Sequence, residues 1–341
     1  MRWNALLLSA LMLFASAVPG GTAAGTGRAA LILDRLHDAN RWRSHVMVVS
    51  HRAGWKENGE IRMAENSRAA IEYAIAAGAE MVELDVRKSA DGQLIVMHDS
   101  WLDRTTTCRG EVDRFTFAQL KACRLVVEGR GTVTAETVPS LAEMLALAKG
   151  RILINIDNKL EPEVLAEIAA EARGLGMAGG ILAKTAVWNG ARIAMAGSVM
   201  EKAGGDVPFM PILADDAVSD ARFMALAART LKAPAAELVH WHADGAPLTE
   251  RGGPLFSAKA RAAAIEGNWH LWVNTYPIVN REPGLLSGGR GDELAWRDGK
   301  PEESWGFWID RGATIIQTDE PKLAIEWLEK NGYRIPYDLT N

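Results

Sequence analysis

The feature that most constrains the fold of this chain is a repeated alternation of apolar, β-like runs with segments whose apolar residues recur at helical spacing. Because helical segments separate most of the β-like runs, the strands should pair in parallel through right-handed crossovers. Eight such units predict an α/β fold, a (β/α)8 barrel of the TIM type. The main strands are expected at 46–50, 81–87, 151–157, 180–185, 208–213, 238–241, 270–275 and 314–318.

One further β-like run, at 93–98, does not fit the repeat. It follows the second strand after a short link containing Asp91-Gly92, which allows a hairpin but not a parallel crossover. We therefore expect an accessory hairpin strand here, followed by a polar, irregular insertion at 99–138 with a small helix near 117–122. Elsewhere helices are expected at 28–37, 65–77, 141–148, 161–174, 191–203, 220–231, 257–266 and 322–331.

The N-terminus has the pattern of a signal peptide. A short positive end, Met1-Arg2, precedes an apolar run at 5–17 that is too short to span a bilayer comfortably. Small residues suit cleavage after Ala17 or Ala24. We expect residues 1–24 to be removed, leaving 28–341 as a single domain that is exported to the periplasm or secreted, with no stable membrane insertion. An uncleaved anchor is the alternative.

Composition excludes one class of partner. The formal net charge of −5 offers no basic surface, so we expect no binding to nucleic acid.

Export would let Cys108 and Cys123 form a disulfide, and closing a loop of that size would stabilise the fold by about 3 kcal/mol. Two separate buried thiols are the alternative.

Three carboxylates fall at the ends of predicted strands. Glu83 and Asp85 are two residues apart, so they share a face and point inward at the barrel mouth, and Asp157 ends the next main strand. Carboxylates this close repel one another unless a proton or cation lies among them. A set of oxygen ligands suits one divalent metal ion, Mg²⁺ or Ca²⁺.

Two histidines and two cations are expected beside this metal site. His51 and His98 also end β-like runs, and imidazole titrates near neutrality, as a general acid or base requires. Arg52 and Lys159 would add positive charge for a phosphate. Metal, cations and a histidine pair predict a site for a small-molecule phosphodiester. His240 and His242 are interpreted either as pocket lining or as ordinary structure.

These residues carry a resemblance to a known family. The motifs HRA at 51–53, EN at 65–66, ELDV at 83–86, DG at 91–92, VMHD at 96–99, LDRTT at 102–106, PSL at 139–141, INIDNK at 154–159 and IIQTDEP at 315–321 occur in one order. Together they resemble the glycerophosphodiester phosphodiesterase family, which belongs to the phospholipase C-like phosphodiesterases on a (β/α)8 barrel. The resemblance runs from about 46 to 328 and is weakest between 186 and 268.

The resemblance implies a role for each matching residue. His51 and His98 would be the acid/base pair, Arg52 and Lys159 would bind the phosphate, and Glu65 and Asn66 would support the substrate site from close range. Glu83, Asp85 and Asp157 would be the metal ligands. Two positions depart from the family pattern: Ala53 stands where the family has Gly, and Asp157 where it usually has Glu.

The implied reaction is metal-dependent hydrolysis of glycerophosphodiesters to glycerol 3-phosphate and an alcohol. The first alternative is a phospholipase of the D or C type acting on a lysophospholipid or sphingomyelin. The polar segment 99–138 argues against it, whereas tryptophans that could rim the mouth favour it: Trp188, Trp241, Trp272, Trp305 and Trp308. A minor alternative is an exported binding protein without catalytic activity.

Overall fold

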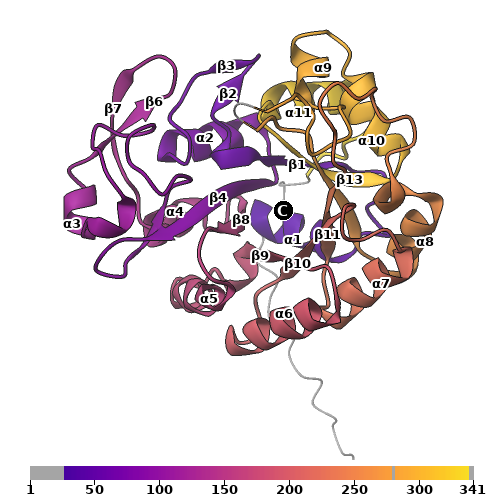
Figure 1. The fold of residues 1–341 in the computed structure, drawn as a ribbon, viewed down its shortest axis with the longest axis horizontal. Coiled ribbons are helices and arrows are strands. Elements are labelled where there is room, and N and C mark those ends of the chain that lie inside the picture. The colour runs from indigo at the N-terminus through magenta and orange to yellow at the C-terminus, as the bar shows by residue number, and fades with distance from the viewer. Residues whose placement is uncertain (1–26, 279–280, 338–341) are drawn as a thin grey trace, which may run out of the picture.

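Parallel strands joined by helices close into a barrel in the computed structural model, which describes residues 27–278 and 281–337 (Figure 1). Within these residues the eight barrel strands are β1 (Met47–Ser50), β4 (Met81–Lys88), β8 (Leu153–Asn158), β9 (Ile181–Ala186), β10 (Phe209–Ala214), β11 (Ala235–Val239), β12 (His270–Asn274) and β13 (Ala313–Thr318). The barrel is closed because β1 pairs in parallel with both β4 and β13. The predicted (β/α)8 fold is therefore confirmed.

Helices surround the barrel, and one of them closes an end (Figure 1). On α1, Ile32 and Leu36 pack against Met47 and Met81, which begin β1 and β4, so α1 covers the amino-terminal end of the strands. The carboxyl-terminal end stays open for a site. Apart from a short helix in the insertion, the α-helices of the described residues are α1 (Arg28–His37), α2 (Arg68–Ala77), α4 (Leu141–Ala148), α5 (Leu165–Gly174), α6 (Gly190–Lys202), α7 (Ala221–Thr230), α8 (Ala258–Gly267), α9 (Asp292–Trp296), α10 (Phe307–Asp310) and α11 (Pro321–Lys330).

Capping residues explain where two of these helices begin. Ser140 and Glu143 form a reciprocal capping box at the start of α4, whose bounds agree with those expected. Helix α2 begins later than predicted, because the Ser67 side chain accepts a hydrogen bond from the Ala70 N–H and caps it there. Residues 65 and 66 consequently lie in the turn before the helix rather than in its first turn.

The insertion after the second barrel strand has more structure than its sequence indicated. As predicted, β5 (Leu94–Val96) pairs with β4 in antiparallel orientation. The insertion then holds α3 (Phe117–Leu120) and a hairpin of β6 (Arg124–Val127) with β7 (Thr132–Thr137), which was not predicted. A second small hairpin joins β2 (Lys56–Glu57) to β3 (Glu60–Ile61) after β1.

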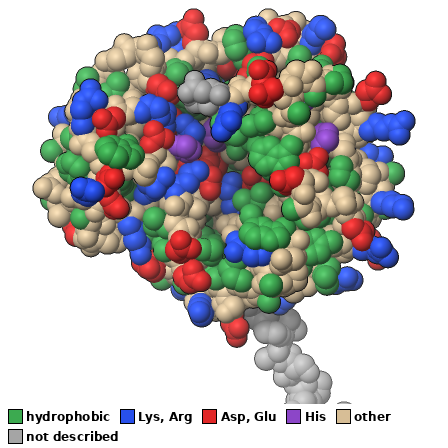
Figure 2. All heavy atoms as spheres, in the orientation of Figure 1, with side chains coloured by type: hydrophobic (Ala, Val, Ile, Leu, Met, Phe, Trp, Pro, Cys, Tyr) green, Lys and Arg blue, Asp and Glu red, His purple; other side chains and the backbone are tan. Residues whose placement is uncertain are grey.

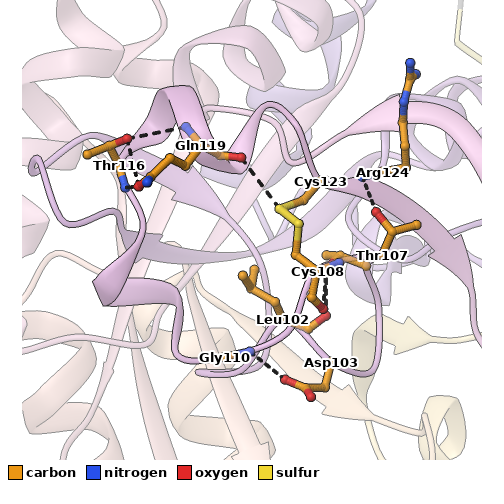
Figure 3. Close-up of a disulfide and its surroundings, with 10 residues drawn as sticks. Leu102, Asp103, Thr107, Cys108, Gly110, Thr116, Gln119, Cys123 and Arg124 are labelled. Carbon is orange, nitrogen blue, oxygen red and sulfur yellow. Dashed lines mark hydrogen bonds between the residues drawn. A yellow bond between two sulfur atoms is a disulfide. The ribbon is translucent and has the colours of Figure 1, made fainter.

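A disulfide ties the insertion together. Cys108 and Cys123 are bonded, and Thr107 Oγ1 beside them accepts a hydrogen bond from the Arg124 N–H at 3.0 Å (Figure 3). The expectation of a disulfide rather than two separate thiols is therefore confirmed.

The predicted signal peptide lies outside the described residues. Among the residues that the structure describes, no helix is both long enough and apolar enough to cross a membrane.

Candidate active site

A cavity of about 290 Å³ opens at the carboxyl-terminal ends of the barrel strands. In the space-filling view, charged and histidine side chains gather in a hollow near the centre of this face (Figure 2). The cavity brings together five residues that the sequence had singled out, with five it had not: His51, Arg52, His98, Asp157 and Lys159, and also Asp99, Arg104, Tyr276, Pro277 and Ile278.

The three predicted metal ligands lie together. One carboxylate oxygen from each of Glu83, Asp85 and Asp157 lies within 4.8 Å of the others, because Asp85 and Asp157 are register partners on β4 and β8. Burial, with the charges of Asp85 and Asp157, raises the pKa of Glu83 well above its usual value. The buried Oε1 of Glu83 has no hydrogen-bond partner among the described residues. An unpartnered oxygen among mutually repelling carboxylates fits a hard divalent cation.

His51 follows β1 and is fixed on two sides. Its Nδ1 lies 2.8 Å from Asp319 Oδ1, and its ring stacks on Tyr276 with centroids 3.6 Å apart. Its other nitrogen, Nε2, lies 4.0 Å from Glu83 Oε2, so it faces the carboxylate cluster. Burial lowers the pKa of His51, although the Asp319 carboxylate opposes this shift.

Asp319 directly follows β13 and has three donors. Besides His51, it accepts hydrogen bonds from Trp55 Nε1 at 3.0 Å and Lys56 Nζ at 2.7 Å. Burial would raise the pKa of Asp319, but the charges of Lys56 and His51 hold it well below its usual range. An ionised carboxylate here keeps a proton on Nδ1 of His51 and leaves Nε2 for chemistry.

A chain of ion pairs connects the second histidine to Arg52. His98 Nδ1 lies 2.7 Å from Asp99, which also accepts from Arg104 Nε at 2.7 Å. Arg104 in turn donates to Glu65 Oε1 at 2.7 Å, and Arg52 Nη1 donates to Glu65 Oε2 at 2.7 Å. Glu65 therefore holds the guanidinium groups of both Arg52 and Arg104 in place.

Asn66 and Lys159 both contact the carboxylate cluster. Asn66 Nδ2 donates to Asp85 Oδ2 at 2.7 Å, so it orients a proposed metal ligand. Lys159 Nζ lies 2.9 Å from Asp85 Oδ1 and 2.8 Å from Asp157 Oδ2. The ammonium group thus balances two carboxylates while it lines the cavity.

The turn after β1 has the backbone conformation that glycine favours, at the position where the resemblance implies a glycine. Arg52 and Ala53 have φ values of 47° and 71°, in the left-handed region, where glycine is unstrained. This backbone aims the Arg52 N–H at Glu83 Oε2, 2.9 Å away. Ala53 keeps the same turn with a fully buried methyl group.

His240 and His242 are not among the residues that line the cavity. Strand β11 ends at Val239, so His240, which the prediction placed within a strand at 238–241, lies just beyond the observed strand. Its Nδ1 pairs with Asp215 and its Nε2 lies 3.0 Å from Thr249 Oγ1, which fixes the loop after β11. These contacts support the interpretation of His240 as a structural residue.

Of the five tryptophans considered as possible rim residues, two are exposed. Trp188 and Trp241 have 46% and 41% of their surface exposed. Trp272, Trp305 and Trp308 are buried in the core, so the expectation that they rim the mouth is wrong.

No role was predicted from the sequence for Asp99, Arg104, Tyr276 or Asp319. Asp319 could have been identified from the sequence, because it directly follows the last strand and lies within the IIQTDEP motif. Its contact with His51 spans 268 positions of sequence, which no local pattern reveals.

Comparison with known proteins agrees with the family that the sequence motifs resemble. The family model described as the glycerophosphoryl diester phosphodiesterase family matches residues 51–266, more than half of the chain, and a second model, a domain of unknown function, matches 209–328. A glycerophosphodiester phosphodiesterase of Bacillus altitudinis is 39% identical over 117 residues, which cover 33% of this chain and 44% of the relative. The chain thus spans less than half the length of that curated relative.

Solved structures show the same fold. A glycerophosphoryl diester phosphodiesterase from Parabacteroides distasonis superposes with a TM-score of 0.64 at 19% identity, covering 92% of this chain and 94% of that one. An Oleispira antarctica phosphodiesterase in complex with the product sn-glycerol-3-phosphate gives 0.54 at 16% identity, covering 83% and 96%. With the matched family model and the residues assembled at the barrel mouth, the chain belongs to the glycerophosphodiester phosphodiesterase family.

Proposed function

We propose that this protein hydrolyses glycerophosphodiesters to glycerol 3-phosphate and an alcohol, with a divalent metal ion, Mg²⁺ or Ca²⁺. One observation carries the proposal: His51 and His98, each held at Nδ1 by a carboxylate, line one cavity with Arg52. A glycerophosphodiester needs proton transfer at two oxygens and positive charge at its phosphate, which this set supplies. The product seen in the Oleispira antarctica phosphodiesterase supports the same chemistry.

The two imidazoles would move the protons of the reaction. One takes the proton of the attacking oxygen, either water or the substrate hydroxyl beside the phosphate. The new P–O bond forms as the bond to the alcohol breaks, and the other imidazole gives its proton to the departing oxygen. If the substrate hydroxyl attacks first, water then opens the cyclic phosphate and the histidines exchange roles. Asp319 and Asp99 keep both rings oriented throughout.

Glu83, Asp85 and Asp157 would hold the metal ion, which when bound would withdraw charge from the phosphoryl group. Asp157 carries one methylene fewer than the glutamate usual in the family. Its carboxylate nevertheless shares the cluster, because its partner Asp85 lies beside it on β4. Arg52 and Lys159 add fixed positive charge at the cavity wall.

Substitution of the histidines tests the proposal. We expect His51→Ala and His98→Ala each to lower kcat at least about 10²-fold. Release of glycerol 3-phosphate from a panel of glycerophosphodiesters, across several divalent metals after chelation, measures both activity and metal preference. His242→Ala, outside the cavity, is the matched control. Wild-type turnover in both single variants would refute the roles of the histidines.

We also propose that the protein acts outside the cytoplasm. The Cys108–Cys123 disulfide supports this, because such bonds persist in oxidising compartments. Cell fractionation with detection of the mature N-terminus tests it, and a full-length cytosolic product would contradict it.

A further inference from the structure

The two histidines of the cavity are held in different ways, and Tyr276 makes the difference. Its ring lies face to face with the His51 ring, with centroids 3.6 Å apart and 12° between the ring planes, and both residues line the cavity. Among the described residues no aromatic ring stacks on His98. The His98 side chain is 33% exposed, against 8% for His51. Tyr276 thus forms a wall against one face of His51 alone.

The order of the barrel strands places Tyr276 beside His51. Tyr276 follows the end of β12 by two residues, after Thr275, whose N–H donates to the Gln317 carbonyl of β13 at 2.9 Å. Asp319 directly follows β13, and His51 directly follows β1. Strands β12, β13 and β1 are consecutive in the sheet. Three neighbouring strand ends therefore supply the imidazole, the carboxylate at its edge and the ring on its face.

The hydrogen bond to Asp319 does not by itself fix the plane of the His51 ring. The Cβ–Cγ torsion of histidine has broad minima, so a ring held only at Nδ1 can still tilt. Its Nε2 lies 4.0 Å from Glu83 Oε2, which is too long for a hydrogen bond. A second ring packed at 3.6 Å removes this freedom, because a tilt would bring ring atoms into collision. Proton transfer needs this control, since Nε2 must come within hydrogen-bond reach of the reacting oxygen.

The Tyr276 side chain stays neutral beside His51. Burial, with the charges of Glu237, Glu83 and Asp157, raises the pKa of Tyr276 well above its usual value. The residue therefore presents an uncharged ring face to the imidazole. Phenylalanine would present the same face, whereas leucine would fill part of the space without a flat surface.

We propose that Tyr276 is a positioning residue for phosphodiester hydrolysis. Its ring fixes the plane of the His51 imidazole and keeps water from that face, while Asp319 fixes the edge of the imidazole. The inference rests on the proposed function for the part that His51 plays in proton transfer, and it adds a residue that acts through this histidine.

A double-mutant cycle measured with glycerophosphocholine tests this role. We expect Tyr276→Leu to lower kcat about tenfold or more with little change in KM, because the rate is sensitive to the position of Nε2. Tyr276→Phe keeps the ring and should retain most of the rate. In the His51→Ala background, Tyr276→Leu should cause no further loss, because the residue it positions is already absent.

Tyr333→Leu is the matched control. Tyr333 is also half-buried and stacks on another ring, that of Trp327, but it does not line the cavity. This variant should turn over like the wild type. Thermal unfolding confirms that each variant is folded.

The NMR signals of the His51 ring test the contact without any substrate. In histidine-labelled protein, the stacked ring should shift these signals upfield in the wild type and in Tyr276→Phe, but not in Tyr276→Leu. His51→Ala assigns the signals. If the wild type cleaves no glycerophosphodiester, the proposed function falls, and this shift still decides whether Tyr276 holds His51.

Three results would overturn the inference. The first is a wild-type His51 signal without the upfield shift. The second is a kcat for Tyr276→Leu that equals that of the wild type or that of Tyr276→Phe. The third is a loss caused by Tyr276→Leu that is as large in the His51→Ala background as in the wild type.

Discussion

At the scale of single residues, the candidate site is organised by carboxylates that lie behind the two histidines. Asp319 holds Nδ1 of His51, and Asp99 holds Nδ1 of His98. Each carboxylate is itself held by cations, Asp319 by Lys56 and Asp99 by Arg104. The histidines are therefore fixed in tautomer and orientation by partners that do not touch the cluster of proposed metal ligands.

Asp319→Asn tests this arrangement. The amide is nearly isosteric but neutral, so it no longer stabilises a protonated His51 or selects its tautomer. We expect kcat to fall at least about tenfold with little change in KM, and the acidic limb of the pH–rate profile to shift to lower pH. Kinetics across pH measure both effects. A variant with the wild-type profile would show that Asp319 serves the fold alone.

Glu83→Gln tests the metal site through binding rather than activity. The substitution keeps the side-chain shape and removes one negative charge from three carboxylates within 4.8 Å. We expect the affinity for Ca²⁺ or Mg²⁺ to fall at least about tenfold by calorimetry. Asp91→Asn, which alters an exposed carboxylate distant from the cluster, should bind metal like the wild type. Equal affinities in Glu83→Gln and wild type would remove Glu83 from the ligand set.

At the scale of elements, the insertion contributes to the lining of the candidate site. It carries Arg104, which lines the cavity and joins Asp99 to Glu65. Its own small core and its disulfide keep this segment ordered although its sequence is polar. The insertion thus positions His98 from outside the barrel.

Removal of the disulfide should therefore affect stability more than chemistry. The Cys108–Cys123 loop spans 15 residues, so the double variant C108A/C123A should lose about 3 kcal/mol of unfolding free energy. The contacts of Arg104 do not involve either cysteine, so kcat should stay within a few fold of wild type at low temperature. Urea unfolding and steady-state kinetics measure the two quantities. A kcat lowered a hundredfold in a folded variant would show that the bond itself maintains the site.

How much of the structure the sequence predicted differs from one element to the next. Strong local signals placed α1 and α4 within their observed bounds, and the strand-end positions of Glu83, Asp85 and Asp157 brought these residues together. The β6–β7 hairpin was missed because its strands have only four and six residues and β7 buries none of its side chains fully. Arg104 and Asp319 were missed for another reason: their importance lies in contacts between segments far apart in the sequence.

At the scale of the whole molecule, buried carboxyl groups titrate in opposite directions. One set is ionised and paired with cations. The charges of Arg334 and His45 outweigh burial and hold the pKa of Glu80 below its usual range. The charges of Lys56 and His51 lower the pKa of Asp319 in the same way. A second set lies near α9 and β13. There burial and neighbouring acids raise the pKa of Asp292 to about 6 and that of Glu293 to about 7.

These two sets predict a maximum of stability at mildly acidic pH. For Glu80 and Asp319 the unfolded chain binds more protons at low pH, so stability rises with pH up to about 4.5. For Asp292 and Glu293 the folded chain binds more protons, so stability falls as pH rises from about 4 toward 7. Without metal, the combined contribution of these four carboxyl groups to the free energy of unfolding should therefore be greatest near pH 5.

Glu293→Gln isolates the alkaline side of this profile. The pKa of Glu293 is raised to about 7, against an ordinary value of 4.5. The ionised carboxylate therefore lowers the free energy of unfolding by at most about 3 kcal/mol at pH 8. The neutral amide of glutamine removes this loss. The variant should be more stable than wild type at pH 8 and similar at pH 5, by urea unfolding in the presence of chelator. Glu302→Gln, at a carboxylate that is not buried, should leave the profile unchanged. An equal gain at both pH values would mean that packing, rather than the buried charge, limits stability at this position.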